Sequence, residues 1–401
     1  MKWTKMENGF RIPVKSWCEE VEPGALAQAE NLAKHPVLAQ HVALMPDCHQ
    51  GYGMPIGGVV AAKDAVIPSA VGVDIGCGMI AVETDVPAER LAEMEFRRAI
   101  QERVKECIPV GEGVGHREAQ EWDGFEEYLD QNGKVSNFVN ALDRKNLGTL
   151  GGGNHFLEIQ RSDAGIVWLM IHSGSRNLGK RIEEYYHSKA VKLNERFHVS
   201  LPDSELAFLP IQEQEGHEYF RDMTFALKYA FENRQRMMTV LKQIFADFVP
   251  ETRFLREVNI HHNYAAFEEH FGETYCIHRK GATSAKKDET GIIPGSMGTA
   301  SYIVRGLGNP ESFMSCSHGA GRRMSRVAAC RDLTVEECDA AMTGIVCERW
   351  HPYRKYGKGK KGMVDLSEAP QAYKAIDEVI SAERDLVEPL VRLTPLAVLK
   401  G

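Results

Sequence analysis

The sequence lacks the cysteine spacing that marks a disulfide framework or a zinc ribbon. Its nine cysteines are an odd number, lie far apart and include no Cys-x-x-Cys pair. The spacing therefore argues against a disulfide-stapled secreted fold and against a structural zinc ribbon alike. We expect most of these cysteines to be small buried hydrophobic residues.

Long apolar stretches are also missing. No run of about 18 apolar residues occurs, so we expect no transmembrane helix. The first residues, MKWTKMENGFRIPVKSW, contain no apolar core of the kind found in a signal peptide. We therefore expect a cytoplasmic protein without a membrane partner.

An excess of positive charge is missing as well, because the formal net charge is −8. This balance argues against non-specific coating of nucleic acid but leaves room for a local basic groove. Positive charge does gather late in the chain, in HRKGATSAKK (278–287), GRRMSR (321–326) and HPYRKYGKGKK (351–361). The last run adds two tyrosines, a composition that suits phosphate contacts beside base stacking, although a solvated loop has the same composition.

Helix and strand patterns are mixed along the 401 residues. Helical patterns lie at 24–34, 87–106, 216–248, 333–349 and 369–391. Strand patterns lie at 41–46, 58–62, 78–86, 155–159, 166–172, 301–307 and 395–399. Glycine-rich joints such as GYGMPIGG and GTLGGGNH separate them. The mixture predicts an α+β fold whose glycine joints are loops around one site.

The segment HSGSRNLGKR (172–181) is close to a P-loop, since Gly174, Gly179 and Lys180 match G-x-x-x-x-G-K. Arg181 stands where a P-loop has the Ser or Thr that holds Mg²⁺, which makes a true P-loop improbable. An anion site at the start of the following helix, with Arg176 reaching a phosphate, remains open.

Residues with metal-ligating side chains stand beside glycine-rich turns and strand ends. Asp74 and Cys77 lie three apart in VGVDIGCGM, so a tight turn would bring their side chains together. His155 follows a glycine run, His172 ends a strand pattern, and VNIHHNY (258–264) carries paired histidines. A lone histidine is more often a core residue than a ligand, but this group indicates one or two metal ions. Ligand softness alone predicts zinc.

His318, in SCSHGAGR, is a candidate nucleophile. No Lys-x-Asp-Gly occurs, so the usual lysine nucleophile of nucleotidyl-transferring ligases is not evident. An imidazole nitrogen can attack a phosphate to form a phosphoramidate, and the adjoining glycines would let backbone N–H groups hold phosphate oxygens.

Segments spread along nearly the whole chain resemble the RtcB family of RNA-splicing ligases. They are, in order, MPDCHQGYGMPIGGV, VGVDIGCGM, LGTLGGGNHFLEI, HSGSR, NIHHNY, RKGA, IIPGSMGTASYIV, SCSHGAGR, AYKAID and LKG. The resemblance implies an RtcB-like fold, a single catalytic domain (1–401) of packed β-sheets with surrounding helices. It also implies a ligase that uses GTP and Mn²⁺ to join RNA 3′-phosphate or 2′,3′-cyclic phosphate ends to 5′-hydroxyl ends, in tRNA splicing or RNA repair.

The resemblance also implies roles for individual residues. Two Mn²⁺ ions would be held by Asp74, Cys77, His155, His172 and His262, with the Cys77 thiolate shared between them. His318 would be the catalytic histidine that becomes guanylylated. The guanine nucleotide would contact Asn154, His155, Phe156, Leu157, Glu158, His262, Asn263, Pro294, Gly295, Ser296, Met297, Ser301, His318, Gly319, Ala320, Gly321, Tyr373 and Lys400.

RNA ends are the partner that the resemblance implies, together with an archease-like activator. Two departures from the family pattern bear on RNA. Asn177 stands where the family carries glycine, and the segment 351–362 differs from the family and is basic. We expect neutralisation of Lys358, Lys360 and Lys361 to weaken RNA binding without affecting guanylylation.

Two other function classes share parts of this pattern. A dinuclear-metal phosphodiesterase or phosphatase acting on RNA ends would need the same metal ligands. A non-catalytic protein that binds RNA ends would need only the basic surface. His318 within its glycine run and Lys400 favour nucleotidyl transfer, because hydrolysis requires neither.

Overall fold

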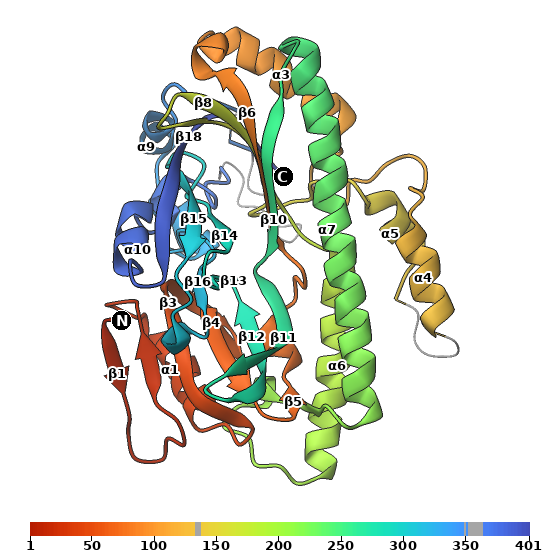
Figure 1. Ribbon diagram of the computed structural model, residues 1–401, viewed down its shortest axis with the longest axis vertical. Coiled ribbons are helices and arrows are strands. Elements are labelled where there is room, and N and C mark those ends of the chain that lie inside the picture. The colour runs from red at the N-terminus through yellow and green to blue at the C-terminus, as the bar shows by residue number, and fades with distance from the viewer. Residues whose placement is uncertain (133–137, 349, 352–363) are drawn as a thin grey trace.

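Two β-sheets lie one above the other along the long axis of the molecule (Figure 1). The computed structural model describes residues 1–132, 138–348, 350–351 and 364–401. The basic segment from residue 352 onward, with Lys358, Lys360 and Lys361, lies outside the described residues. The prediction of an α+β fold is confirmed, because the described chain combines helices with mainly antiparallel sheets.

The smaller sheet has six strands in the order β1-β2-β3-β4-β12-β11. The strands are β1 (Trp3–Lys5), β2 (Val14–Ser16), β3 (Leu38–Tyr52), β4 (Met54–Ala62), β12 (Glu273–Lys280) and β11 (Asn263–His270). Only β2 and β3 run parallel; the other neighbours are antiparallel. The strands predicted at 41–46 and 58–62 are confirmed within β3 and β4.

The larger sheet has eight strands and is nearly closed, because its first and last strands, β10 and β14, lie next to each other. Its order is β10 (Phe254–His261), β6 (Gly78–Pro87), β8 (Ile166–Ser173), β7 (Phe156–Ser162), β18 (Val387–Lys400), β15 (Ser301–Gly306) and β14 (Thr290–Ile293), with β17 (Val346–Cys347) paired to β18. All five strands predicted in these regions are confirmed. Two short pairs, β5 (Ala65–Val66) with β9 (Leu209–Pro210) and β13 (Ala282–Ser284) with β16 (Ser315–Ser317), complete the pairing described.

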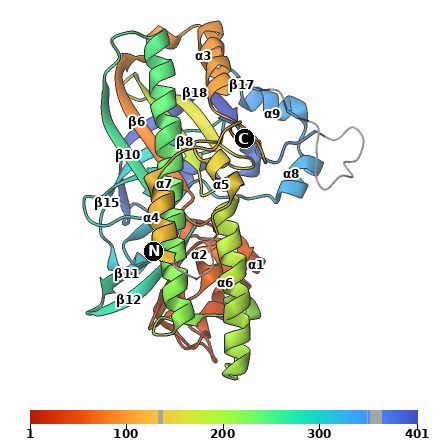
Figure 2. The same cartoon turned by 90° about the vertical axis from the view of Figure 1, so that its right-hand side faces the viewer.

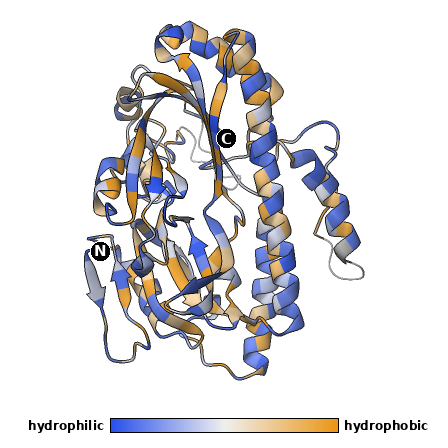
Figure 3. Ribbon diagram, viewed as in Figure 1, coloured by the Kyte–Doolittle hydropathy of each residue, from blue (hydrophilic) through white to orange (hydrophobic). Residues whose placement is uncertain are grey.

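A long helix, α7 (Gln214–Phe248), runs beside both sheets and joins two hydrophobic cores (Figures 1 and 2). Its first half contributes Tyr219 and Phe225 to the core that includes the smaller sheet. Its second half contributes Met237 and Leu241 to the core on the larger sheet. Hydrophobic and hydrophilic residues alternate along α7 in Figure 3, as expected for a helix that buries one face. The helix predicted at 216–248 is thus confirmed.

The remaining helices cover the sheets and the ends of the molecule. They are α1 (Pro23–Ala33), α2 (Pro68–Val71), α3 (Met94–Cys107), α4 (Asp123–Asn132), α5 (Ala141–Asn146), α6 (Asn177–Arg196), α8 (Arg326–Asp332), α9 (Val335–Ala341) and α10 (Ile376–Ala382). Short 3₁₀ turns lie at Ala88–Leu91, Ser204–Leu206, Pro310–Ser312 and Pro370–Ala372. Within the described ranges, none of these helices combines the length and apolar character needed to cross a bilayer.

Strand alternation gives the larger sheet an outer and an inner face. Leu157 and Leu399 point outward into the core shared with α7. Phe156 points inward, into a separate cluster inside the curled sheet. Because side chains on a strand alternate between faces, Glu158 and Lys400 also lie on the inner face. The candidate nucleotide residues of β7 and β18 therefore share one surface.

Three predicted helices differ from the structure. The helix predicted at 333–349 ends at Ala341, since the chain turns at Gly344, whose φ is 83°, and then forms β17. The helix predicted at 369–391 is only Ile376–Ala382, since Pro370–Ala372 forms a 3₁₀ turn before it and the chain from Val387 pairs with β15 after it. The helix predicted at 87–106 begins only at Met94, after a 3₁₀ turn.

Candidate active site

Asp74 and Cys77 are brought together by a four-residue turn. Cys77 N donates a hydrogen bond to Asp74 O at 3.0 Å, and Gly76 at the third position has a φ of 77°. A positive φ at this position is what a type II turn requires, and glycine adopts it without strain. The turn that the sequence spacing suggested is thus present, and both side chains face the same centre.

Three histidines converge on this turn from the larger sheet. Cys77 Sγ lies 3.2 Å from His172 Nε2 and 3.6 Å from His155 Nε2. Asp74 Oδ2 lies 3.2 Å from His155 Nε2. His262 occupies the single residue between β10 and β11, where the chain passes from one sheet to the other, and its Nε2 lies 3.4 Å from His172 Nε2. All five predicted metal ligands therefore meet at the junction of the sheets.

A hydrogen bond on the far side of the His172 ring leaves its Nε2 atom free to bind a metal. His172 Nδ1 lies 3.1 Å from Asn154 O. A carbonyl can only accept, so Nδ1 of His172 carries the proton and its Nε2 presents a lone pair to Cys77. This is the tautomer that a metal-ligating histidine needs. His155 Nδ1 lies 3.0 Å from Leu150 O and 3.1 Å from Arg176 Nη1, an acceptor and a donor, so these contacts do not select one tautomer of His155.

The charge states of these side chains fit a site built for cations. Burial holds the pKa values of His172 and His262 well below the usual range, so both rings are neutral at pH 7. Burial alone would raise the pKa of Asp74, but the hydrogen bond with His155 and the charges around it keep that pKa low. The donors form two groups of three that share Cys77, namely Cys77 with His172 and His262, and Cys77 with Asp74 and His155.

Two buried polar residues of α7 hold the ligand loops in place. Arg234 donates from Nη1 to Gly76 O and to Ser173 O, both at 2.9 Å. These carbonyls directly precede Cys77 and follow His172 in the chain. Asn233 bonds through its amide to Thr149 and to Gly174 O, in the two loops that adjoin the ligands. Neither residue was predicted from the sequence, although a polar pair inside a long amphipathic helix is a signal that could have indicated them.

His318 stands beside the metal-ligand cluster and is oriented by a buried carboxylate. Its ring centroid lies 4.9 Å from that of His262. Asp47, on β3 and fully buried, accepts from His318 Nδ1 at 2.6 Å and from His318 N at 3.1 Å. Although burial alone would raise the pKa of Asp47, the neighbouring His318 keeps that pKa low, so the carboxylate is charged. Nδ1 therefore carries a proton, and Nε2 is left with a free lone pair. Asp47 lies within the MPDCHQG run, but the sequence analysis gave it no role.

The glycines around His318 are required by close backbone contacts. A Cβ on Gly321, whose φ is 70°, would lie 2.2 Å from Asp47 O. A Cβ on Gly281 would lie 2.3 Å from an Ile56 methyl and 3.1 Å from His318 Cε1. Contacts below about 3 Å are impossible for carbon, so only glycine fits at both positions. The glycines therefore let the chain pack tightly around the imidazole.

The inner face of the larger sheet carries the candidate nucleotide contacts. Burial raises the pKa of Glu158 to about 8, and Lys400 is the cation that offsets part of this effect. Gln160 donates to Glu158 Oε2 at 2.6 Å and to Ser301 Oγ at 3.2 Å, so these side chains form one polar row. Lys400 Nζ lies 5.6 Å from the centre of the Phe156 ring. A carboxyl group and an ammonium on one wall of a buried site can pair with the edge of a guanine base.

A cluster of cations surrounds Glu368 at the end of this row. Lys400 Nζ and Arg322 Nη1 each lie 3.3 Å from the Glu368 carboxylate, and Arg326 Nε lies 3.2 Å away. Burial would raise the pKa of Glu368, but these three cations hold it at about 2. The Tyr373 hydroxyl also bonds to Glu368, and the Arg322 guanidinium lies over the Tyr373 ring. The cluster carries net positive charge where phosphates are expected.

Comparisons with known proteins show which family the chain belongs to. Residues 28–401 match the family described as "tRNA-splicing ligase RtcB". The chain belongs to the RtcB family. It is 42% identical to the RNA-splicing ligase RtcB of Escherichia coli K12, over 97% of both chains. It is 32% identical to the tRNA-splicing ligase RtcB of Thermococcus kodakarensis, over 99% of this chain and 96% of that one. The RNA-splicing ligase RtcB of Mycobacterium tuberculosis is also 32% identical, over 93% of this chain and all of the relative.

Some residues that the RtcB resemblance assigns to the nucleotide have other contacts in this structure. Asn263 is held on both sides, since its amide donates to Asp74 O and accepts from Gly281 N. Met297 packs with Met342 and Val398. Leu157 points to the outer face.

The nucleotide segments Pro294–Met297 and His318–Gly321 lie against each other in the described chain. Ala320 N donates to Pro294 O at 2.9 Å. Gly295 N donates to Ser301 Oγ at 3.2 Å, and Ser296 N donates to Thr299 Oγ1 at 2.7 Å. Gly319 lies beside Pro294 as well. The Asn154 side chain is exposed, and its carbonyl is the group that fixes His172.

The P-loop-like segment of this RtcB member contacts the candidate metal ligands instead. A Cβ on Gly174 would lie 2.4 Å from Asp74 Oδ1, so the glycine makes room for the ligand. Lys180 is exposed and pairs with Glu184 on α6. Arg176, at φ 58°, turns its guanidinium onto Leu150 O at 3.2 Å and His155 Nδ1 at 3.1 Å. Its contacts in the described chain are thus with a metal-ligand loop.

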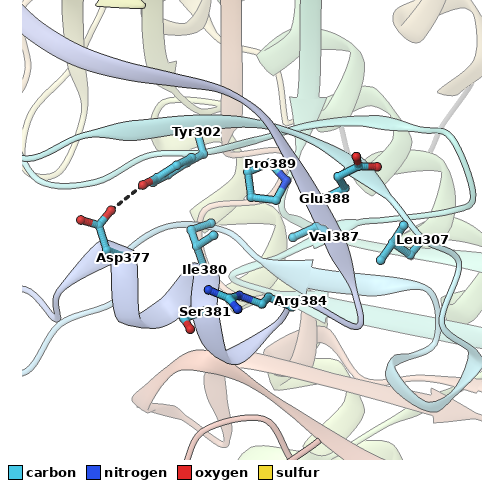
Figure 4. Close-up of a pocket in the computed structure, with 9 residues that line it drawn as sticks. All are labelled: Tyr302, Leu307, Asp377, Ile380, Ser381, Arg384, Val387, Glu388 and Pro389. Carbon is cyan, nitrogen blue, oxygen red and sulfur yellow. Dashed lines mark hydrogen bonds between the residues drawn. The ribbon is translucent and has the colours of Figure 1, made fainter. Parts of the chain in front are cut away.

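A surface pocket of about 550 Å³ lies away from this centre, between α10, β15 and β18 (Figure 4). Tyr302 points into it and donates to Asp377. Its neighbour Ser301 points to the opposite face of β15, toward the polar row. The pocket therefore shares a strand with the RtcB site but none of the candidate ligands.

Proposed function

We propose that the protein is a GTP-dependent RNA ligase that works through a histidine-GMP intermediate. It would join RNA ends carrying a 3′-phosphate or 2′,3′-cyclic phosphate to ends carrying a 5′-hydroxyl, in tRNA splicing or RNA repair. The observation that carries the proposal is the Asp47–His318 pair, placed beside a cluster of metal ligands. The RtcB family membership supports the RNA-ligase class.

The first step uses His318 as the nucleophile. Asp47 holds the proton on Nδ1, so the Nε2 lone pair is free to attack the α-phosphorus of GTP. The Nε2–P bond forms as the bond from that phosphorus to the β-phosphate bridge oxygen breaks, and pyrophosphate leaves. The ring gains positive charge as the bond forms, and the Asp47 carboxylate stabilises that charge.

The later steps transfer the GMP group. A cyclic phosphate would first be opened by water to a 3′-phosphate. An oxygen of the RNA 3′-phosphate attacks the phosphorus of the histidine-GMP, and the P–N bond breaks. The 5′-hydroxyl oxygen then attacks the activated RNA phosphate, its proton is lost, and GMP leaves as the phosphodiester forms.

The proposed cofactor is a pair of Mn²⁺ ions held by Asp74, Cys77, His155, His172 and His262. The thiolate, carboxylate and imidazole donors, with their Nε2 lone pairs facing inward, suit transition-metal ions. When bound, the ions supply positive charge that polarises the α-phosphate and offsets charge on the attacking and leaving oxygens.

Guanine recognition is assigned to Glu158 and Lys400. Once ionised, the Glu158 carboxylate can accept from the two N–H groups on the guanine edge. The Lys400 ammonium favours that ionised form and can donate to the guanine carbonyl oxygen. Tyr373 and the cations around Glu368 would flank the phosphates and the RNA end. An archease-like protein is a proposed activator of this cycle.

The test is protein labelling with α-³²P-GTP and Mn²⁺, read on the denatured chain. We expect an acid-labile, alkali-stable label that is absent from His318→Gln. His217→Gln, at an exposed position of α7, is the matched control and should label like the wild type. A label that persists in His318→Gln would reject His318 as the nucleophile. Removal of RNA end phosphates without joining would favour the dinuclear phosphodiesterase instead.

A further inference from the structure

Two thiols lie side by side behind the proposed nucleophile. Cys18 follows β2, and Cys48 lies on β3 directly after Asp47. The two side chains hydrogen-bond to each other. Cys48 is 1% exposed and Cys18 is 6% exposed, so the pair is buried but Cys18 reaches the surface at its edge. The contact joins the N-terminal segment to the strand that carries the orienting carboxylate.

Lys374 contacts both this thiol pair and the backbone around Asp47. Lys374 Nζ donates to Pro46 O at 3.0 Å and to Cys48 O at 2.8 Å, the carbonyls on either side of Asp47. The same ammonium lies 3.6 Å from Cys18 Sγ. Lys374 thus holds both the thiol of Cys18 and the peptide units that fix the position of Asp47.

The two thiols differ in acidity. The hydrogen bond from Cys48 and the Lys374 ammonium lower the pKa of Cys18 to about 7, against the opposing effect of burial. The hydrogen bond with Cys18 and burial raise the pKa of Cys48 well above its usual value. Cys18 is therefore the more acidic and more readily ionised of the two thiols, while Cys48 keeps its proton. A thiolate beside a second thiol is the arrangement that reacts with peroxides and then resolves to a disulfide.

We propose that Cys18 and Cys48 form an oxidative modification site, at which a peroxide produces a reversible disulfide that displaces Asp47 and slows attack by His318. The effect on His318 rests on the proposed function. The formation of the disulfide does not.

The chemistry balances with a peroxide as the two-electron oxidant. The Cys18 thiolate attacks one oxygen of H₂O₂, the O–O bond breaks, and hydroxide leaves, giving Cys18 sulfenic acid. Cys48 sulfur then attacks Cys18 sulfur; the S–O bond breaks, the Cys48 proton is lost, and the hydroxide that leaves becomes water. Both thiols are oxidised, and H₂O₂ is reduced to two waters. A dithiol such as dithiothreitol reverses the reaction by thiol–disulfide exchange.

Formation of the disulfide would affect the position of His318 through β3, the tightly packed strand that carries both Cys48 and Asp47. Bond formation draws the sulfurs from hydrogen-bonding contact to about 2.05 Å. It also removes the thiolate charge that faces Lys374. On the other side of the strand, Asp47 O is packed against Gly321, where a Cβ would lie 2.2 Å away. A shift of Cys48 therefore passes to Asp47 and to the segment that carries His318.

The experiment treats the Mn²⁺-loaded protein with H₂O₂, alkylates free thiols and identifies cross-linked peptides by mass spectrometry. The rate of guanylylation is measured on the same samples. We expect a Cys18–Cys48 cross-link and a fall in labelling rate of about tenfold or more, since small displacements of reacting groups cost up to about 100-fold. Dithiothreitol should restore the rate.

Variants separate this site from oxidation of the metal ligand Cys77. Cys18→Ser should label at the wild-type rate and keep that rate after H₂O₂. Cys107→Ser, which changes a thiol on α3, is the matched control and should respond like the wild type.

Oxidised wild-type protein without the cross-link would overturn the proposal. Equal loss of activity in Cys18→Ser, or a cross-link with an unchanged rate, would overturn the link to His318. Absence of label in fully reduced protein would instead count against the proposed function, and the cross-link would still test the thiol pair.

Discussion

At the scale of single residues, the site is organised by groups that fix protons. Asp47 fixes the proton of His318 on Nδ1, and the carbonyl of Asn154 does the same for His172. In both cases the partner is an acceptor that cannot donate. The free nitrogen then faces the centre, either toward the metal ligands or toward the proposed nucleotide.

The role of Asp47 can be tested with Asp47→Asn. An asparagine amide placed against Nδ1 can donate, which favours the wrong tautomer with the proton on Nε2. We expect the rate of guanylylation to fall by about 100-fold or more, as in other enzymes where a carboxylate orients a histidine. The measurement is the initial rate of labelling with α-³²P-GTP.

Mn²⁺ content should be unchanged in Asp47→Asn, because Asp47 is not among the candidate ligands. Asp64→Asn, an exposed carboxylate on the turn after β4, is the control. A labelling rate within about twofold of wild type, in protein that keeps its fold, would show that Asp47 does not orient the nucleophile.

At the scale of elements, the ligand loops depend on α7. The helix crosses both cores and places Asn233 and Arg234 against the carbonyls next to Cys77 and His172. Burial lowers the pKa of Arg234 to about 10, so the guanidinium is still charged at neutral pH. The guanidinium donates to the carbonyl oxygens of Gly76 and Ser173, and these hydrogen bonds hold the two loops in position.

Arg234→Met should weaken metal binding. The change keeps the length of the side chain but leaves Gly76 O and Ser173 O without their donor. We expect Mn²⁺ affinity to fall about 10- to 100-fold, the range found when groups that orient metal ligands are removed. Affinity is measured by titration of free Mn²⁺ by electron paramagnetic resonance, with Arg236→Met on the same helix as control.

Arg234→Lys should rescue little of this affinity, because an ammonium lacks the planar fork that reaches both carbonyls. Wild-type Mn²⁺ affinity in a folded Arg234→Met protein would mean that the loops hold their positions without α7.

The sequence predicted the parts of this fold that have one strong local signal. The amphipathic period of α7 and the apolar runs of β6 and β8 gave their positions closely. It failed at the start of β18, where a helix was predicted through residue 391, because the residues around Pro389 form a strand only by pairing with β15. The candidate site followed from motif resemblance, whereas Asp47 and Lys374 act through contacts between distant segments that no local pattern shows.

At the scale of the whole molecule, the site belongs to no single part of the chain. His262 links the two sheets, Asp47 comes from the smaller sheet, and Lys400 comes from the larger one. The molecule as a whole carries a net charge of −8, so an RNA substrate must be held by local positive charge. The cations around Glu368 are one such group, and the run 351–361 in the sequence supplies another.

The contribution of that run can be measured with a triple variant, Lys358→Gln, Lys360→Gln and Lys361→Gln. We expect weaker RNA binding and a salt dependence that is less steep by about two units, since each phosphate contact on single-stranded RNA contributes about 0.7 to the slope. Guanylylation should be unchanged, because the reaction of His318 with GTP does not involve RNA. The control replaces Lys63, Lys192 and Lys228, exposed lysines outside the basic runs, which should leave the slope unaltered. An unchanged affinity and slope in the first variant would assign RNA binding to the cations around the active site instead.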